Sequence, residues 1–311
     1  MTTSSSTTDT LRRGPNADDT LSVVTVCCTR AVADACEGAG LRGIDAVALG
    51  RAFAGAFLLM ANAKRDEERL RIQIAGEGQL GQIIVDIHGD GRGRAALQAP
   101  LPTEHPLHIL VHEEPRPVVS PAVGLPGTMT ITRDLGVARR YQGHVDLVSA
   151  EIDEDLQAYL HESEQVRSAL RVDVRLDEQG RVVAAGGVLV QALPHTPDEL
   201  IDEAQVRLGG GAVYERLAGG ATHEGLAALA LGVDPSALEL GPQLERPIRF
   251  ECNCGSERAR RVLSSLGADD LEALADEQPV TEIRCNFCGK VTQVDAAAVR
   301  EIAASIRRRT N

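Results

Sequence analysis

Aromatic side chains are scarce in this sequence of 311 residues. Phe, Tyr and Trp together make up 2% of the chain, and there is no Trp at all. Lys is rarer still, since Lys64 and Lys290 are the only two, and Arg carries the remaining positive charge. With so few rings, a hydrophobic core has to be built from Ala, Val, Leu and Ile.

The sequence also lacks a long uninterrupted apolar stretch. The longest run, residues 52–61, is too short to cross a bilayer, which takes about 20 apolar residues. The N-terminus has no apolar segment of the secretory type. We therefore expect a cytoplasmic protein without a membrane partner, in a compartment where thiols stay reduced. There, clustered cysteines indicate a metal or redox site more often than a disulfide framework.

Net positive charge is missing as well, because the formal net charge is −13 at pH 7. Surfaces that bind nucleic acid are basic, so this charge argues against nucleic acid as a partner. No P-loop for ATP is present, since Gly289-Lys290 is followed by Val291 instead of Ser or Thr. Residues 76–81 match the G-x-G-x-x-G dinucleotide motif, but residues 82–87 have the pattern of a strand, which favours a β-hairpin.

What the sequence does contain is cysteine in two tight pairs. Cys252-Asn253-Cys254 and Cys285-Asn286-Phe287-Cys288 hold four of the seven cysteines and are separated by residues 255–284. Four sulfurs at the corners of a tetrahedron are the ligand set that Zn²⁺ prefers. We predict that these four cysteines bind one zinc ion per chain. The remaining three, Cys27, Cys28 and Cys36, are interpreted as small buried apolar side chains.

The apolar pattern divides the chain into four segments and predicts an α+β protein. Residues 1–20 are rich in Ser, Thr and Asp, and we expect a disordered tail. Residues 21–194 combine helical stretches with many alternating segments, which predicts a mainly antiparallel sheet domain with packed helices. Residues 195–249 contain short helices separated by Gly runs, for which a plain helical connector is the simplest interpretation. Residues 250–311 form a small domain that carries the paired cysteines.

This small domain has few large side chains, so we expect its fold to depend on the metal. Structural zinc can contribute roughly 10–16 kcal/mol to a domain of this kind. Zinc-bound cysteines are thiolates, the form that oxidants attack. A closed, inert structural site is one interpretation. The other is a site at which oxidation closes local disulfides, expels zinc and unfolds the domain together with the connector.

At these residues the sequence resembles the Hsp33 family of redox-regulated holdase chaperones. The Cys-x-Cys and Cys-x-x-Cys pairs match the zinc centre of that family. Three upstream segments look like signatures of its core domain, namely Arg140-Tyr141-Gln142-Gly143, Ser163-Glu164-Gln165 and residues 184–191. The likeness runs from about residue 20 to the end of the chain.

The resemblance implies a core chaperone domain over residues 21–194, a metastable helical linker over 195–249 and a zinc-binding redox switch over 250–311. The reduced, zinc-bound protein would be inactive. Oxidation would form the disulfides Cys252–Cys254 and Cys285–Cys288, release zinc and unfold the linker. The activated homodimer would then hold unfolding client proteins without ATP, as part of the response to oxidative stress, and would not be an enzyme.

Two other functions use the same cysteines. A thiol-disulfide oxidoreductase could use Cys285 and Cys288, although such enzymes place the pair at a helix N-terminus, whereas we predict a hairpin here. A zinc-ribbon nucleic-acid-binding protein would be consistent with the basic run Arg307-Arg308-Arg309, but not with the acidic chain as a whole.

Overall fold

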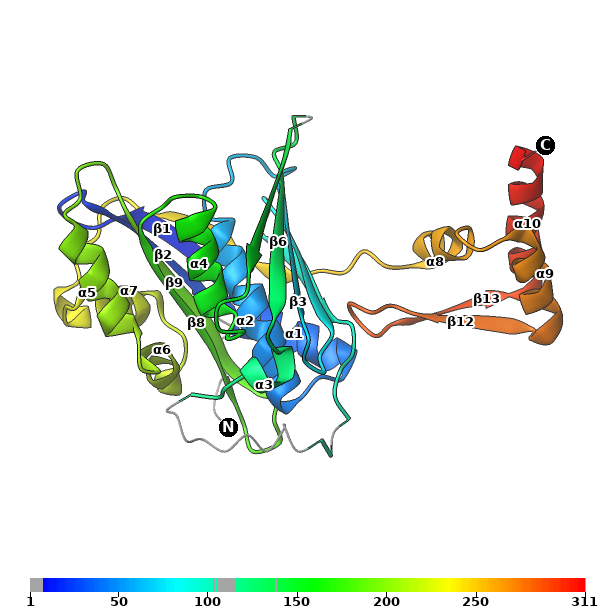
Figure 1. Cartoon of the computed structure of the whole chain (residues 1–311), viewed down its shortest axis with the longest axis horizontal. Coiled ribbons are helices and arrows are strands. Elements are labelled where there is room, and N and C mark those ends of the chain that lie inside the picture. The colour runs from blue at the N-terminus through cyan, green and yellow to red at the C-terminus, as the bar shows by residue number, and fades with distance from the viewer. Residues whose placement is uncertain (1–7, 103, 106–115, 138, 311) are drawn as a thin grey trace. The chain divides into compact units, whose positions relative to one another are not determined.

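The computed structural model describes residues 8–102, 104–105, 116–137 and 139–310. The chain divides into two compact units, Met1–Glu251 and Cys252–Asn311 (Figure 1). No helix within the described ranges is long and apolar enough to span a membrane.

Two sheets form the framework of the first unit. One has five strands in the order β10-β1-β2-β9-β8, and the other has six in the order β11-β5-β4-β3-β6-β7. Neighbouring strands pair antiparallel except β11 and β5, which are parallel. The strands are β1 Thr10–Pro15, β2 Leu21–Cys27, β3 Arg69–Gly76, β4 Gln82–His88, β5 Arg92–Leu97, β6 Gly127–Asp134, β7 Arg140–Asp146, β8 Ser168–Leu176, β9 Val182–Ala192, β10 Leu244–Pro247 and β11 Arg249–Phe250. The antiparallel pairing of β3 and β4 confirms the β-hairpin predicted around residues 76–81.

Helix α2 (Gly43–Leu59) lies between the two sheets. It contacts β8 and β9 of one sheet and β4 and β5 of the other, and all of its residues after Gly43 are buried. A helix that is covered on every side has to be apolar all round, which explains the long apolar run in this segment. The exceptions are Asp45 and Arg51, and the buried guanidinium of Arg51 lies 2.9 Å from Asp173 and 2.8 Å from Glu151. Helices α1 (Thr29–Ala39) and α4 (Asp153–Glu162) flank α2.

The opposite face of the five-stranded sheet is covered by the predicted connector. Helices α5 (Asp198–Leu208), α6 (Ala212–Arg216) and α7 (His223–Leu231) lie there, as Figure 1 shows. They share one buried apolar cluster with the sheet, made of Leu21, Val23, Ala169, Ala184, Val188, Val190, Ile201, Ala204, Leu208, Val213, Leu217, Leu226, Ala227 and Ala230. After α7 the chain forms a 3₁₀ turn at Pro235–Ala237.

The prediction of a disordered tail over residues 1–20 is wrong for residues 10–15. This segment forms β1, which pairs with β2 on one side and β10 on the other. Leu11 is buried within the main core cluster. The strand partner at residues 244–247 is far away in the sequence, so no local pattern could reveal this pairing.

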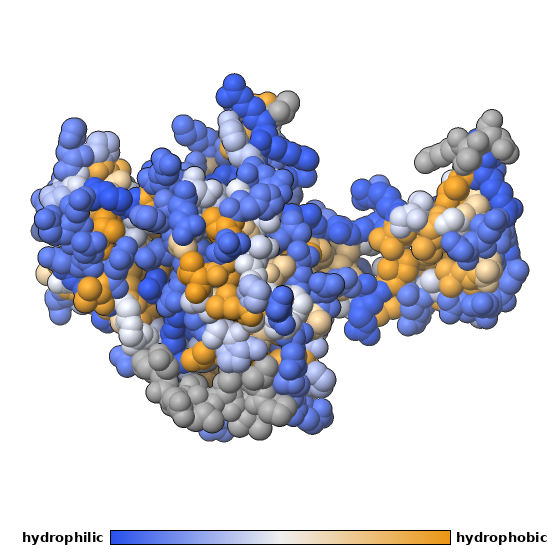
Figure 2. All heavy atoms as spheres, viewed as in Figure 1, coloured by the Kyte–Doolittle hydropathy of each residue, from blue (hydrophilic) through white to orange (hydrophobic). Residues whose placement is uncertain are grey.

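The second unit contains three helices and one hairpin among its described residues: α8 Ser256–Leu263, α9 Ala268–Glu277, β12 Val280–Arg284, β13 Val291–Asp295 and α10 Ala296–Thr310. Its buried apolar cluster is small, contains no aromatic ring and consists of Ala259, Leu263, Leu271, Ala275, Val294, Val299, Ile302 and Ala303. Further apolar side chains stay exposed around α8, including Val262 and Leu266 (Figure 2).

The boundary between the units lies two residues beyond the predicted one. Phe250 belongs to β11, and its ring meets that of Phe53 edge to face at 6.5 Å between centroids. The main-chain N–H of Glu251 also donates a hydrogen bond to the carbonyl of Gly93 at 2.8 Å. The second unit therefore begins at Cys252, the first cysteine of the paired set.

Candidate metal centre

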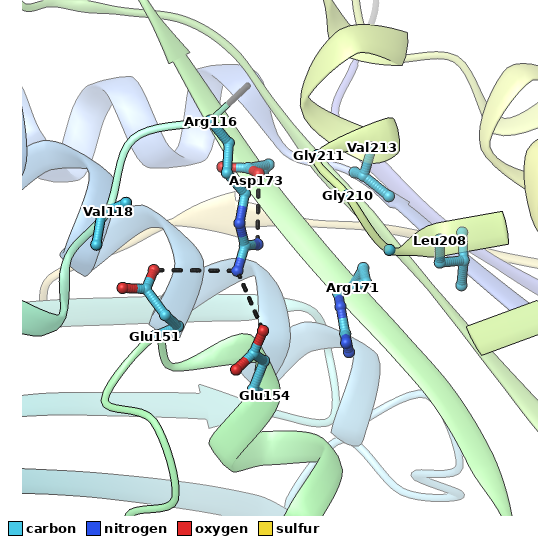
Figure 3. Close-up of a pocket in the computed structure, with 11 residues that line it drawn as sticks. Arg116, Val118, Glu151, Glu154, Arg171, Asp173, Leu208, Gly210, Gly211 and Val213 are labelled. Atoms are coloured by element: carbon cyan, nitrogen blue, oxygen red, sulfur yellow. Dashed lines mark ion pairs between the residues drawn. The ribbon is translucent and has the colours of Figure 1, made fainter. Parts of the chain in front are cut away.

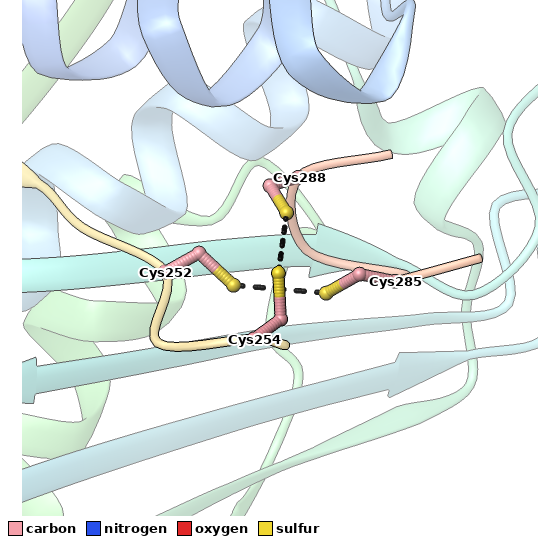
Figure 4. Close-up of side chains that lie close together, drawn as sticks. All are labelled: Cys252, Cys254, Cys285 and Cys288. Carbon is pink, nitrogen blue, oxygen red and sulfur yellow. Dashed lines mark hydrogen bonds between the residues drawn. The ribbon is translucent and has the colours of Figure 1, made fainter. Parts of the chain in front are cut away.

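The four predicted ligands come together at one end of the second unit. Cys252 and Cys254 lie on the extended segment before α8, while Cys285 follows β12 and Cys288 lies in the turn to β13. Figure 4 shows the four thiols pointing toward one another. All four Sγ atoms lie within 4.8 Å of one another, and each cysteine is partly exposed.

The hairpin turn that carries the second pair is closed by main-chain bonds. The N–H of Gly289 donates to the carbonyl of Cys285 at 2.8 Å, and the N–H of Cys285 donates to the carbonyl of Lys290 at 2.9 Å. Gly289 has φ +68°, in the left-handed region that favours glycine. The glycine after Cys288 thus lets the chain turn back immediately, which places Cys285 and Cys288 side by side.

The sulfur positions fit a tetrahedral ion. A zinc–sulfur bond of about 2.3 Å implies sulfur–sulfur edges of about 3.8 Å in a tetrahedron. The Sγ atoms of Cys252 and Cys285 are 3.6 Å apart, and those of Cys254 and Cys288 are 3.2 Å apart. The group is therefore positioned to bind a metal ion. These two close contacts join one pair to the other, so sulfur distances alone do not select the disulfide partners.

The crowded thiols perturb one another's ionisation. Burial, together with Cys285, raises the pKa of Cys252, and burial together with Cys288 raises the pKa of Cys254 to about 11. Burial acts in the same direction on Cys285, but N–H donors from Phe287 and Cys288 outweigh it and lower the pKa of Cys285 to about 7. Four thiolates this close together need a cation to offset their charge.

The other three cysteines lie in the first unit, away from the cage. Cys28 and Cys36 are buried and Cys27 is half-buried. Burial raises the pKa of Cys27 and of Cys36 to about 12, and raises that of Cys28 as well. These thiols are protonated at neutral pH, and their burial agrees with their interpretation as small apolar side chains.

A second polar site, in the first unit, has charged side chains that compensate one another (Figure 3). Arg116 lies 3.6 Å from Asp173, 3.7 Å from Glu154 and 3.9 Å from Glu151. The cavity, of about 230 Å³, is also lined by the glycine loop of residues 209–211. Because the Arg116 guanidinium already has several carboxylate partners, we interpret this network as a structural one that holds neighbouring elements of the first unit together.

The fold and the site define an α+β protein whose small second unit carries a four-cysteine cage for a metal ion. The family model of the Hsp33 protein matches residues 9–295. A "33 kDa chaperonin" of Synechococcus sp. (strain JA-2-3B'a(2-13)) is 38% identical over 98% of this chain and 93% of that protein. One from Latilactobacillus sakei subsp. sakei is 33% identical over 95% of this chain and 99% of that protein. The chain belongs to the Hsp33 family.

A solved structure agrees with this assignment. The 33 kDa chaperonin of Thermotoga maritima superposes with a TM-score of 0.84 at 25% identity, covering 97% of this chain and 100% of that one. The core signatures noted in the sequence lie in β7, directly after α4 and in β9. The relatives that the chain matches are named as chaperonins, a non-enzymatic class of protein.

Proposed function

We propose that this protein is an ATP-independent holdase that is inactive while its four cysteines are reduced and bound to metal, and that oxidation activates it. The observation that carries the proposal is the cage itself. Two cysteine pairs converge within 4.8 Å in a unit whose buried apolar cluster is small and contains no aromatic ring. A fold of this size gains little from apolar burial, so the state of the cysteines decides whether it persists.

The ion that we propose for the cage is Zn²⁺, held by Cys252, Cys254, Cys285 and Cys288, with one ion per chain. Four thiolates in a closed tetrahedral arrangement are typical of structural zinc sites. When bound, the ion would hold the hairpin turn to the segment before α8 and contribute about 10–16 kcal/mol to folding. None of these cysteines belongs to the apolar cluster of the unit, so that cluster alone does not hold their end of the unit together.

Oxidation would convert these ligands to disulfides. Following the family pattern, we propose Cys252–Cys254 and Cys285–Cys288 as the products, each within one short segment. A disulfide sulfur is no longer a thiolate, so each bond formed removes two ligands and the ion is lost. This switch works only if the four cysteines are reduced before the oxidant appears. Thiols stay reduced in the cytoplasm, so we propose that the protein works there.

The connector over residues 195–249 would be the element that transmits this change. Its helices are short, and Gly210 and Gly211 have positive φ between α5 and α6. Helices of this length depend on packing to stay folded. The chain runs from β10 through β11 directly into Cys252, so unfolding of the second unit would leave the C-terminal end of the connector held only by the pairing of β10 with β1 and of β11 with β5.

Release of the connector would uncover one face of the five-stranded sheet. Strand residues such as Val23, Val188 and Val190, now covered by α5–α7, would become exposed together with the apolar sides of the helices. Contiguous apolar surface of this kind binds unfolding proteins and second copies of the same chain. We propose that client proteins bind here and that the activated form is a homodimer.

A client-aggregation assay tests the proposal. The reduced, zinc-loaded protein and a sample oxidised with hydrogen peroxide at elevated temperature are each added to a thermally unfolding client, and light scattering is followed. We expect zinc release, loss of four thiols and suppressed aggregation only in the oxidised sample. Replacing all four cysteines with serine separates the switch from general effects of oxidation, because that variant should not respond to peroxide. Zinc release with unchanged client aggregation would refute the holdase proposal.

A further inference from the structure

We propose that a groove beside the cage binds the disulfide of a small anionic thiol and delivers its sulfur–sulfur bond to Cys254 or Cys285. This inference rests on the proposed redox function and adds the chemical class of an oxidant. The groove lies between α8 and the β12–β13 hairpin and has a volume of about 280 Å³. Cys254 and Cys285 both line it, so a molecule bound there lies next to two of the four sulfurs.

Apart from the cysteine thiols, the charged side chains that line the groove are both positive. Arg258 of α8 and Arg284 at the end of β12 line it, and none of its lining residues is acidic. Asn286 and Thr292 add polar groups, while Val262 and Phe287 supply apolar surface. Two guanidiniums on opposite walls fit a ligand that carries carboxylates at both ends of a flexible backbone.

Among the residues that the structure describes, these two arginines differ from their neighbours in having no carboxylate partner. Within the part of the chain that the structure describes, no ion pair joins Arg258 or Arg284 to an acidic side chain. Four other arginines of the same unit do pair: Arg260 with Glu301, Arg261 with Glu257, Arg300 with Asp276 and Arg307 with Asp269. The two groove arginines thus remain available to a ligand.

Arg258 is also held in place. Its guanidinium carbon lies 6.0 Å from the centroid of the Phe287 ring, within the range of a cation–π contact. Phe287 is the residue just before Cys288, so this contact joins α8 to the hairpin turn that carries the second cysteine pair. Residues Cys252–Asn311 contain nine Lys or Arg and nine Asp or Glu, so the positive groove is a local feature of a neutral unit.

The chemistry is two successive thiol–disulfide exchanges. A groove thiolate, Cys254 or Cys285, attacks one sulfur of the bound disulfide, a protein–ligand sulfur bond forms, and one small thiolate leaves with the electron pair of the broken bond. A second cage thiolate then attacks the protein sulfur of that mixed disulfide and expels the other small thiolate. Two cysteines lose two electrons in total, and the small disulfide gains them as two thiolates.

A different role for the arginines would be to offset the negative charge of four thiolates around a divalent ion. In that case their loss would weaken metal binding or change the rate for every oxidant equally. A docking site instead changes the rate only for anionic disulfides. The ligand charge therefore separates the two roles.

The experiment measures zinc release from the full-length, reduced, zinc-loaded protein with three disulfides of different charge. The probes are glutathione disulfide (anionic), 2-hydroxyethyl disulfide (neutral) and cystamine (cationic). We expect Arg258→Gln and Arg284→Gln each to slow release by glutathione disulfide about 2- to 5-fold, the range of an exposed charge contact, and to leave the neutral probe unchanged. Arg261→Gln, on the same helix but outside the groove, should leave all three rates unchanged.

Two further readouts complete the test. Mass spectrometry after brief treatment should find the glutathione adduct on Cys254 or Cys285, and zinc content before oxidation verifies that each variant is folded and loaded. Equal slowing for all three probes, or an adduct confined to Cys252 and Cys288, would overturn the groove proposal. A parallel measurement with hydrogen peroxide separates the groove proposal from the proposed function. If peroxide releases zinc but the three disulfides show no dependence on charge, the groove proposal alone is rejected. Failure of every oxidant to release zinc rejects both.

Discussion

His223 makes the docking of α7 onto the sheet sensitive to pH. Its ring lies at the start of α7, is 9% exposed and contacts two threonines, Thr10 of β1 at 2.8 Å and Thr25 of β2 at 2.7 Å. A neutral imidazole has one donor and one acceptor, so it serves both hydroxyls at once. Burial, followed by the nearby charge of Arg12, lowers the pKa of His223 from 6.5 to about 4.

The sign and size of the effect follow from that shift. A base whose pKa is depressed by folding stabilises the folded state above its unfolded pKa, and this stabilisation is lost as the pH falls from 6.5 toward 4. Between pH 7 and pH 5 the loss is about 2 kcal/mol, or about 20-fold in the opening equilibrium. Arg12, Glu224 and Glu245 face the ring, and Arg12 bonds to both carboxylates at 2.6–2.8 Å.

Amide hydrogen exchange of His223–Leu231, corrected for the intrinsic effect of pH, measures this opening directly. We expect the protection of α7 to fall about 20-fold from pH 7 to pH 5 in the reduced protein and to become nearly independent of pH in His223→Gln. His161→Gln, at an exposed position on α4, is the matched control and should behave as the wild type. An equally steep pH dependence in His223→Gln would refute this account of α7 docking.

Three further outcomes are expected. Leu226→Ala removes a fully buried side chain of α7 and should destabilise the docked connector by about 2–4 kcal/mol, measured as chaperone activity at a lower oxidant dose, whereas Val206→Ala at an exposed position of α5 should change nothing measurable. Gly289→Ala forces a side chain into φ +68° and should cost about 1–2 kcal/mol, read as weaker zinc retention in a chelator competition, while retention equal to wild type would contradict the role of this turn. Arg12→Ala removes two partly exposed ion pairs, and we expect a loss of about 1 kcal/mol that shrinks at high salt in denaturant unfolding; a loss that salt does not alter would argue against ion pairing.

The cysteine cage and the fold class could be predicted because their signals are local. Two short cysteine spacings and a following glycine specify the turn chemistry, and alternation specifies the strands. The end of α4 could not be placed as well, because the helical pattern that begins at Asp153 runs on to Arg167 in the sequence, whereas the helix ends at Glu162. There the chain turns back toward β8, with Gln165 at φ 56°.

The features that sequence reasoning missed depend on distant partners. β1 pairs with its sequence neighbour β2 on one side but with the distant β10 on the other, and His223 contacts threonines near the N-terminus. Arg258 and Arg284 look like any surface arginines until the hairpin and α8 place them on the walls of one groove. Contacts between residues this far apart are set by tertiary packing, which local patterns do not encode.

The proposed switch requires above all that the second unit stays folded only while its metal is bound. Amide exchange across residues 195–311 of the fully reduced protein, before and after zinc is removed by a chelator, measures it without any oxidant. We expect protection to collapse first around the cysteine segments, then over the rest of Cys252–Asn311, and finally in α5–α7. A metal-free, reduced protein that keeps full protection in Cys252–Asn311 would contradict the account.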